Sequence, residues 1–134
     1  MVERETDESS SLQRFLQVYR KSQVVFEEGS TGSEMYLIHS GRVRLSVRRG
    51  KGQETELAVL HPGAFFGEMA LVDDCERSAT ASALDDDTQL IALDKAKFLY
   101  TVQQQPSFAL SIMHTLCQRL RRLNEQLSSK GDAD

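Results

Sequence analysis

Residues 65–81 read FFGEMALVDDCERSATA, and this stretch combines features that a buried strand does not need. An apolar run opens it, but Gly67 and Glu68 interrupt that run, and a single Arg77 stands between an acidic loop and several small residues. Glycine weakens a strand, and a charged side chain must find a partner if it is buried. These residues therefore indicate a binding function in addition to packing.

The chemistry of this stretch suits a nucleotide. The sequence EMAL after Gly67 is long enough for one helical turn, whose free N–H groups and partial positive charge favour a phosphate. Arg77 offers a charged fork for two phosphate oxygens, and Ser78 offers a hydroxyl donor. Glu68 has the wrong charge for phosphate, but a carboxylate can accept a hydrogen bond from a ribose hydroxyl. The alternative is a structural ion pair, in which Glu68 or the acidic loop 72–76 holds Arg77.

Composition limits the other functions. The chain has 134 residues, 40% of them hydrophobic and 27% charged, which fits one globular domain. Its formal charge of -4 provides no broad basic field for nucleic acid or anionic membranes. No segment resembles a secretory signal or approaches the roughly 18 apolar residues of a membrane span. We therefore expect a cytoplasmic protein without a membrane partner.

Metal and catalytic sites are not expected either. Cys75 and Cys117 form no CxxC pair, and the three histidines are isolated rather than clustered as a metal-binding barrel enzyme requires. No G-x-S-x-G or comparable arrangement turns a serine into a nucleophile. The sequence thus predicts a protein that is not an enzyme and holds no metal.

Short β-prone segments fill the middle of the chain. They are separated by glycine-containing turns, a pattern typical of an antiparallel roll or barrel; they cover residues 23–30, 34–40, 42–49, 55–61, 78–84 and 88–93. SGRV at 40–43 and GKGQ at 50–53 are interpreted as hairpin turns. Before them, a capping box at Ser10 and apolar residues at helical spacing predict a short amphipathic helix, with Leu12, Phe15, Leu16 and Tyr19 on one face.

Two helices are predicted at the other end. Asp94 is a plausible N-cap for a helix over residues 95–104, and Pro106 opens a longer helix to about Leu127. That helix carries a narrow apolar seam at 3,4,3,4 spacing, formed by Met113, Leu116, Leu120, Leu123 and Leu127. Such a seam predicts a homodimer through this helix, although the same side chains could pack on their own domain instead.

The central stretch also resembles a known motif. FGEMALVDDCERSA is similar to the phosphate-binding cassette of the cyclic nucleotide-binding domains found in catabolite activator proteins, protein kinase A regulatory subunits and nucleotide-gated channels. That cassette reads approximately F-G-E-(L/M)-A-L, a short loop, then R-(S/T/A)-A. FEEGSTGSEMYLIHSGRVRLSV and LHPGAFFGE agree with the family's turn glycines, at Gly29, Gly41, Gly63 and Gly67.

The resemblance covers about residues 12–127 and implies a mainly β fold with flanking helices. This fold is an antiparallel, jelly-roll-like β-roll with an N-terminal helix and a long C-terminal helix. We expect a binding domain over residues 9–127, with flexible tails at 1–8 and 128–134.

The resemblance also implies roles for individual residues. Glu68 would contact the ribose 2'-hydroxyl and Arg77 the cyclic phosphate, with Ser78 and the amides around 67–70 and at Ala79 completing the phosphate cradle. Arg119 would approach the base or Glu68, and Asn124 occupies a place from which the catabolite activator donates a base contact. Leu123 departs from the activators, which have a hydroxyl residue there. The complete expected ligand-binding set is Gly67, Glu68, Met69, Ala70, Arg77, Ser78, Ala79, Arg119 and Asn124.

The function implied is that of a stand-alone sensor of cAMP, or of cGMP, that relays ligand occupancy to an unidentified effector protein. Ser78 follows Arg77 as in the catabolite activators, which favours cAMP; the amide of Asn124 can rotate to suit either base. The sequence ends at Asp134 without a helix-turn-helix, so no direct DNA binding is expected. The alternative is a protein-interaction scaffold of the same fold that needs no nucleotide.

Overall fold

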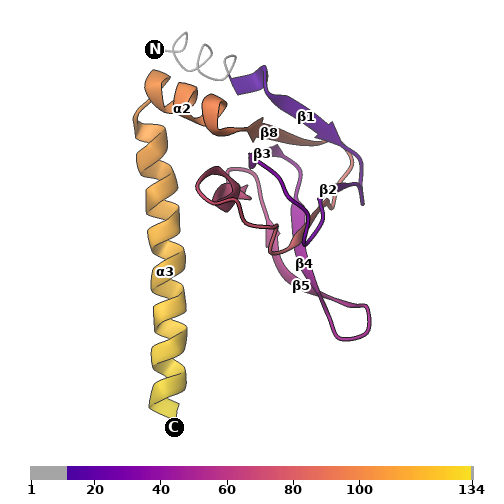
Figure 1. Ribbon diagram of the computed structural model, residues 1–134, viewed down its shortest axis with the longest axis vertical. Helices are drawn as coiled ribbons and strands as arrows, with labels where there is room; N and C mark the ends of the chain where they lie inside the picture. Colours follow the sequence, from indigo (N-terminus) through magenta and orange to yellow (C-terminus); the bar gives the residue numbers. More distant parts are fainter. Residues whose placement is uncertain (1–11, 134) are drawn as a thin grey trace. The chain divides into compact units, whose positions relative to one another are not determined.

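The fold is known from a computed structural model, which describes residues 12–133, with side chains through residue 128. The described chain forms two compact units that divide after Lys97. The first unit contains the strands and the second contains most of the helical residues (Figure 1).

The first unit is built from two antiparallel sheets of four strands each (Figure 1). Sheet A has the order β1-β8-β3-β6, and sheet B has the order β2-β7-β4-β5. Their bounds are β1 Leu16–Tyr19, β2 Val24–Phe26, β3 Met35–Ser40, β4 Val43–Arg49, β5 Gln53–Leu60, β6 Phe65–Phe66, β7 Thr80–Ala83 and β8 Thr88–Leu93. This arrangement confirms the predicted antiparallel β-roll.

The core of the roll lies between the inward faces of the two sheets. On β7 the buried Ala81 and Ala83 alternate with Thr80 and Ser82, as expected for a strand with one face in the core. On the central strand β8, five of the six residues are buried. The main buried cluster consists of Tyr36, Ile38, Val43, Phe66, Ala81, Leu90 and Ala92.

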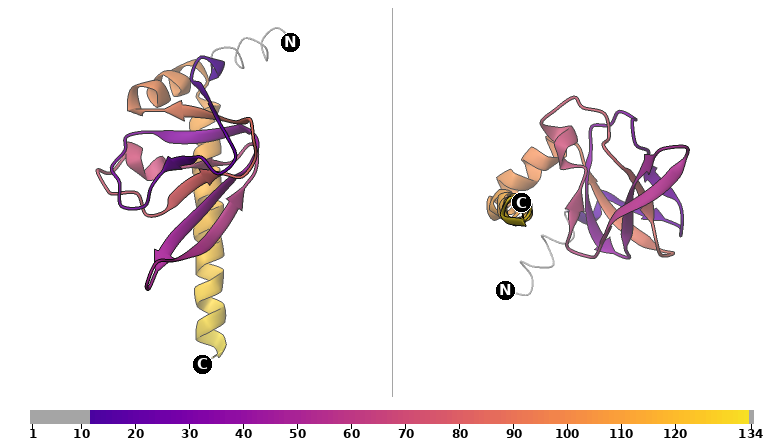
Figure 2. Two further views of the ribbon diagram at one scale, coloured as in Figure 1. Left: turned by 90° about the vertical axis from the view of Figure 1, so that its right-hand side faces the viewer. Right: turned by 90° about the horizontal axis from the view of Figure 1, so that it is seen from below.

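One of the two predicted hairpins is correct and the other is wrong. Gly50 and Gly52 connect β4 to β5, which pair up to Arg49 and Gln53, and this hairpin stands out in Figure 2. The turn at Gly41, by contrast, carries the chain from β3 in sheet A to β4 in sheet B. Gly41 has a φ of 81°, and a Cβ there would lie 2.8 Å from the Cα of Thr88. The glycine is thus needed for a crossing between sheets, which local turn chemistry does not distinguish from a hairpin.

The predicted N-terminal helix needs a partial correction. Its proposed cap at Ser10 lies outside the described residues, and Leu12 is helical. Leu16 and Tyr19 instead belong to β1, where they pair with Ile91 and Thr88 of β8. The pairing with β8 overrides a helical spacing that rested on few side chains.

The helices agree with the prediction at their starts. Helix α2 spans Lys95–Gln104, and the backbone N–H of Lys97 donates to Asp94 Oδ1 at 2.8 Å, which confirms the N-cap. Helix α3 spans Ser107–Ala133 and begins directly after Pro106. It continues beyond the predicted end at Leu127, while the predicted domain boundaries and tails stay a prediction.

Helix α3 presents apolar side chains to solvent. Within the predicted seam, Met113, Leu120, Leu123 and Leu127 are exposed by 53%, 60%, 55% and 67%. Neither α2 nor α3, over the residues described, combines the length and the apolar character that a membrane crossing needs.

Candidate functional site

Gly67, the second residue of the cassette, has a backbone conformation that other residues resist. It follows β6 and has φ 75° and ψ 13°, the left-handed region, at the N-cap of η1, a single 3-10 turn over Glu68–Leu71. The N–H of Ala70 donates to Gly67 O at 3.2 Å. A Cβ at Gly67 would lie 2.8 Å from Arg77 Nη1 and 3.3 Å from Phe26 Cε2, so the absence of a side chain also permits close packing.

Arg77 is buried beside this turn, with only 8% of its surface exposed. Its Nη1 donates to Gly67 O at 3.2 Å, and its Nη2 donates to Glu34 O at 2.8 Å. The guanidinium carbon lies 4.1 Å from the centre of the Phe26 ring. The Nε–H is buried and has no hydrogen-bond partner.

The electrostatic state of Arg77 is unusual for a buried cation. Over the residues that the structure describes, no carboxylate lies within ion-pair distance of its guanidinium. Burial lowers the pKa of Arg77 from its ordinary value, whereas Tyr36 and Glu34 act in the opposite direction. Arginine nevertheless keeps its proton in proteins. The predicted alternative of an ion pair holding Arg77 is therefore not what this structure contains.

The backbone around Arg77 is fixed by the loop after β2. The N–H of Arg77 donates to Ser30 O at 2.7 Å, and the N–H of Gly29 donates to Arg77 O at 2.8 Å. Three residues further on, Thr80 Oγ1 accepts a hydrogen bond from the N–H of Glu28 at 2.9 Å. This loop therefore aligns the end of the cassette with the start of β7.

The structure brings Gly67 and Arg77 into contact, and Glu68 follows in the first turn of η1. Met69 and Ser78 are exposed, Glu68 and Ala70 are half-buried, and Ala79 is buried. The acidic loop 72–76 is exposed, as predicted. Arg119 and Asn124 lie on α3, in the second unit, and their contact with a ligand stays a prediction.

The sequence analysis does not identify three residues that lie next to Arg77 in the structure. Phe26 is an aromatic residue in a strand, which is interpreted as core without further information. Glu34 contributes its backbone carbonyl, for which a sequence carries no side-chain signal. Gly32 has a detectable signal, because it is a further glycine in FEEGSTGSEM; a Cβ there would lie 2.5 Å from Arg77 Nη2 and 2.8 Å from Nε.

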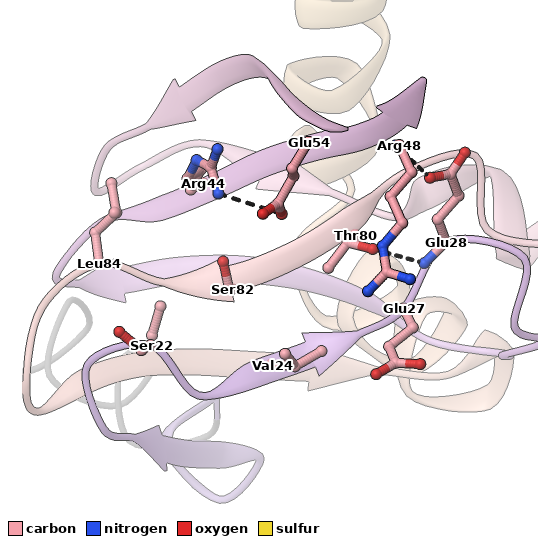
Figure 3. A pocket seen from close by; sticks show the side chains of 11 residues that line it. Ser22, Val24, Glu27, Glu28, Arg44, Arg48, Glu54, Thr80, Ser82 and Leu84 are labelled. Carbon is pink, nitrogen blue, oxygen red and sulfur yellow. Dashed lines mark hydrogen bonds and ion pairs between the residues drawn. The ribbon is translucent and has the colours of Figure 1, made fainter. Parts of the chain in front are cut away.

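A separate groove of about 440 Å³ lies on sheet B, on the side of β7 that carries Thr80 and Ser82 (Figure 3). Figure 3 shows the two hydrogen bonds of Glu28 there: its N–H donates to Thr80 Oγ1, and its Oε1 accepts from the N–H of Arg48 at 2.9 Å. The groove contains none of the predicted ligand-binding residues, and its charges are mixed. Its lining residues are Ser22, Val24, Glu27, Glu28, Arg44, Arg48, Glu54, Thr80, Ser82, Ala83 and Leu84.

The described residues contain no group of three or more His, Cys, Asp and Glu side chains that could hold a metal ion. The cassette brings together a buried guanidinium, the exposed residue Ser78 and the start of η1, groups of the kind that can bind an anion, with the carboxyl residue Glu68 directly after Gly67.

Comparison with known proteins agrees with this geometry. The family model described as the cyclic nucleotide-binding domain matches residues 16–105. The cyclic AMP receptor protein of Thermus thermophilus is 40% identical over 110 residues, which cover 82% of this chain and 50% of the receptor. This chain thus spans about half the length of that relative.

Solved structures give the same result. The catabolite activator protein of Thermus thermophilus has a TM-score of 0.78 and 38% identity, with 91% of this chain and 58% of that chain covered. The EAL enzyme Bd1971 in its cAMP-bound form has a TM-score of 0.59 and 36% identity, with 81% of this chain and 29% of that chain covered. The chain described here belongs to the cyclic nucleotide-binding domain family.

Proposed function

We propose that this chain is a regulatory sensor module that binds a cyclic nucleotide, with Arg77 on the cyclic phosphate and Glu68 on the ribose. The observation that carries the proposal is the buried guanidinium of Arg77, which has no carboxylate partner and one unpaired N–H over the described residues. A buried charge is costly unless a partner compensates for it. A cyclic phosphate has one negative charge and supplies that partner.

The hydrogen bonds of Arg77 support an anionic ligand. Two of its five N–H groups donate to the carbonyls of Gly67 and Glu34, which are neutral acceptors. A phosphate oxygen is a stronger acceptor, because charge-assisted hydrogen bonds are about twice as strong as neutral ones. Ser78 is exposed and directly follows Arg77, and η1 begins directly after Gly67, so we expect the Ser78 hydroxyl and the first amides of η1 to add donors to the same phosphate.

Between the two common cyclic nucleotides, the proposal favours cAMP. Ser78 follows Arg77 as in the catabolite activators, and the Thermus thermophilus relative is named for cyclic AMP. Bd1971 also has a cGMP-bound form, which matches this chain at 34% identity with a TM-score of 0.59. A titration with both ligands tests the preference, and tighter binding of cGMP would reverse it.

The relay of ligand occupancy is proposed to run through α3 and a second copy of the chain. The exposed apolar seam on α3 has the spacing of a helix that pairs with another helix. Arg119 and Asn124 lie on the same helix, so a ligand that contacts them would bind better to one position of α3 and shift the population toward it. The effector protein that responds is unidentified.

The test is isothermal titration calorimetry on the wild type, Arg77→Ala and Arg49→Ala. Truncating one member of a buried charge pair costs about 2–5 kcal/mol, or about 30-fold to a few thousand-fold in affinity, so Arg77→Ala should lose most binding. Arg49 lies exposed on β4, and its alanine variant should bind like the wild type. Circular dichroism would show that the variants are folded.

Two results would contradict the proposal. A folded Arg77→Ala variant with unchanged affinity would remove Arg77 from the site. A wild type that binds neither nucleotide would favour the alternative function, a protein-interaction scaffold.

A further inference from the structure

We infer that Phe26 is a positioning residue for the ligand-binding site, because its ring holds the guanidinium of Arg77 in the plane from which it can bind phosphate. The inference rests on the proposed function. It assigns a role to a strand residue outside the cassette.

The contact is close and direct. The guanidinium carbon of Arg77 lies 4.1 Å from the centre of the Phe26 ring, well within the roughly 6 Å over which a cation is attracted to an aromatic face. Phe26 ends β2, and the loop that follows it binds the backbone of Arg77 through Ser30 and Gly29. The side chain and the backbone of Arg77 are therefore both held from the same segment.

The ring itself has little freedom. Its centre lies 5.9 Å from that of Tyr36 and 5.8 Å from that of Phe66, and both of these residues are buried. Tyr36 and Phe66 are stacked on each other, with 5.3 Å between their centres and 17° between their planes. A ring fixed by this aromatic cluster can impose its orientation on the guanidinium.

Two kinds of contact orient the guanidinium of Arg77, namely hydrogen bonds to backbone carbonyls and the face of the Phe26 ring. The carbonyls of Gly67 and Glu34 bind two of its nitrogens, but a hydrogen bond to a carbonyl tolerates a broad range of angles. The ring adds a face against which a planar guanidinium lies. An aliphatic residue fills similar space but has no ring quadrupole, so it would leave the plane less restricted.

The competing explanation is that Phe26 only packs in the core. A purely structural residue would tolerate an aliphatic replacement without loss of affinity, provided that the protein still folds. The two explanations therefore differ in what Phe26→Leu and Phe26→Tyr do to binding, rather than in what they do to stability.

The experiment measures cAMP affinity by calorimetry for the wild type, Phe26→Leu, Phe26→Tyr and Val25→Ala. Phe26→Leu should lower the affinity about 5- to 30-fold, the range expected for a partly desolvated cation–π contact. Phe26→Tyr keeps an aromatic ring and should bind with an affinity close to that of the wild type. Val25 is the matched packing control, because it lies beside Phe26 on β2 and packs against the same core cluster. Its alanine variant should lose stability but keep its affinity.

A spectroscopic measurement separates positioning from packing. The ring current of Phe26 should shift the Arg77 Nε–H proton upfield in the NMR spectrum, and Arg77→Lys identifies the signal by removing it. The shift should persist in Phe26→Tyr and vanish in Phe26→Leu. If Phe26→Leu does not fold, Phe26→Met provides an unbranched replacement for both measurements.

Each outcome has a distinct meaning. A wild type that binds no cyclic nucleotide would overturn the proposed function and this inference with it. A wild type that binds, together with a folded Phe26→Leu or Phe26→Met variant of equal affinity, would overturn the inference alone. Equal losses of affinity in Phe26→Leu and Phe26→Tyr would also overturn it.

Discussion

At Arg77, two backbone carbonyls and one aromatic ring surround a cation that is usually buried with a carboxylate. This environment also depends on the absence of side chains. Gly32 and Gly67 both approach the guanidinium so closely that a Cβ would lie within 2.8 Å of one of its nitrogens. Gly67 also has a left-handed backbone conformation, whereas Gly32 does not. A substitution of Gly32 therefore tests the lack of space for a side chain without adding backbone strain.

Gly32→Ala should therefore weaken ligand binding with little change in stability. The new methyl group would push the Nη2 and Nε nitrogens away from their present positions. These atoms lie at the far end of a flexible side chain, so the guanidinium can shift without moving the backbone, and the change affects ligand binding more than the fold. We expect at least a roughly fivefold loss of cAMP affinity by calorimetry. Ser33→Ala, at the exposed neighbouring position, is the control and should bind like the wild type. An unchanged affinity in Gly32→Ala would show that the guanidinium is free to move.

The proximity of Gly67 and Arg77 could be predicted, because both belong to a cassette that the glycine-bearing motif identifies. Their roles in ligand binding stay a prediction. The environment of Arg77 could not be predicted in the same way. The carbonyl of Glu34 exists in every residue, and Phe26 becomes significant only when β2 folds against the cassette. A sequence pattern gives the type and spacing of side chains. The contacts of Arg77 with the Glu34 carbonyl and the Phe26 ring depend instead on the path of the backbone in the folded chain.

Among the elements, the turn at Gly41 determines how the two sheets are joined. It crosses from β3 to β4 over Thr88 of β8, and the close approach to the Thr88 backbone leaves no room for a side chain. Gly29 has nearly the same φ, 83° compared with 81°, but nothing lies within 4 Å of the position of its Cβ. The two glycines therefore differ in their surroundings and not in their backbone.

Alanine substitutions at both positions should separate strain from contact. Gly29→Ala should cost about 1–2 kcal/mol of unfolding free energy, the penalty for a left-handed residue with a Cβ. Gly41→Ala should cost that amount plus about 1–3 kcal/mol for the contact with Thr88. Chemical denaturation of both variants measures the difference. Equal losses of stability would contradict the proposed role of close approach at Gly41.

The strands themselves were largely predictable, since alternating side chains mark a segment that is half-buried. Their partners were not. SGRV at 40–43 and GKGQ at 50–53 have the same kind of turn residues, yet one joins two sheets and the other joins neighbours within a sheet. The local sequence indicates the very short strand β6 only as part of the cassette, and it predicts a helix where β1 lies. Pairing with a distant strand decides these cases, and its signal does not lie in the local sequence.

For the whole molecule, the exposed seam on α3 predicts a dimer in solution. Leu120→Asp would place a charge in the middle of this seam, where a helix pair has no water to solvate it. Light scattering should report a dimer for the wild type and a monomer for Leu120→Asp. Gln118→Asp is the control, because Gln118 is exposed and its spacing from Leu116 and Leu120 places it on the face of α3 opposite the seam; this variant should remain a dimer.

The same measurement with and without cAMP tests the coupling. A ligand that prefers one position of α3 should change the dimer population, because it can shift an equilibrium only through its different affinity for the two states. A wild type that is monomeric with and without cAMP would contradict the dimer. A fraction of dimer that is the same with and without cAMP would contradict only the coupling.

The order of the strands in the two sheets also determines when the molecule can fold. Strands β1 and β2 are synthesised first, but they lie at sheet edges and pair with β8 and β7, which come last. Neither sheet can be completed until residues 80–93 have left the ribosome, because these residues contain β7 and β8. Contacts between segments so distant in the sequence also make folding slow. Arg77 lies just before β7, and its environment needs the loop after β2. The ligand site is therefore completed in the same late step that completes both sheets, so a chain interrupted before this step has no partly formed site to offer a nucleotide.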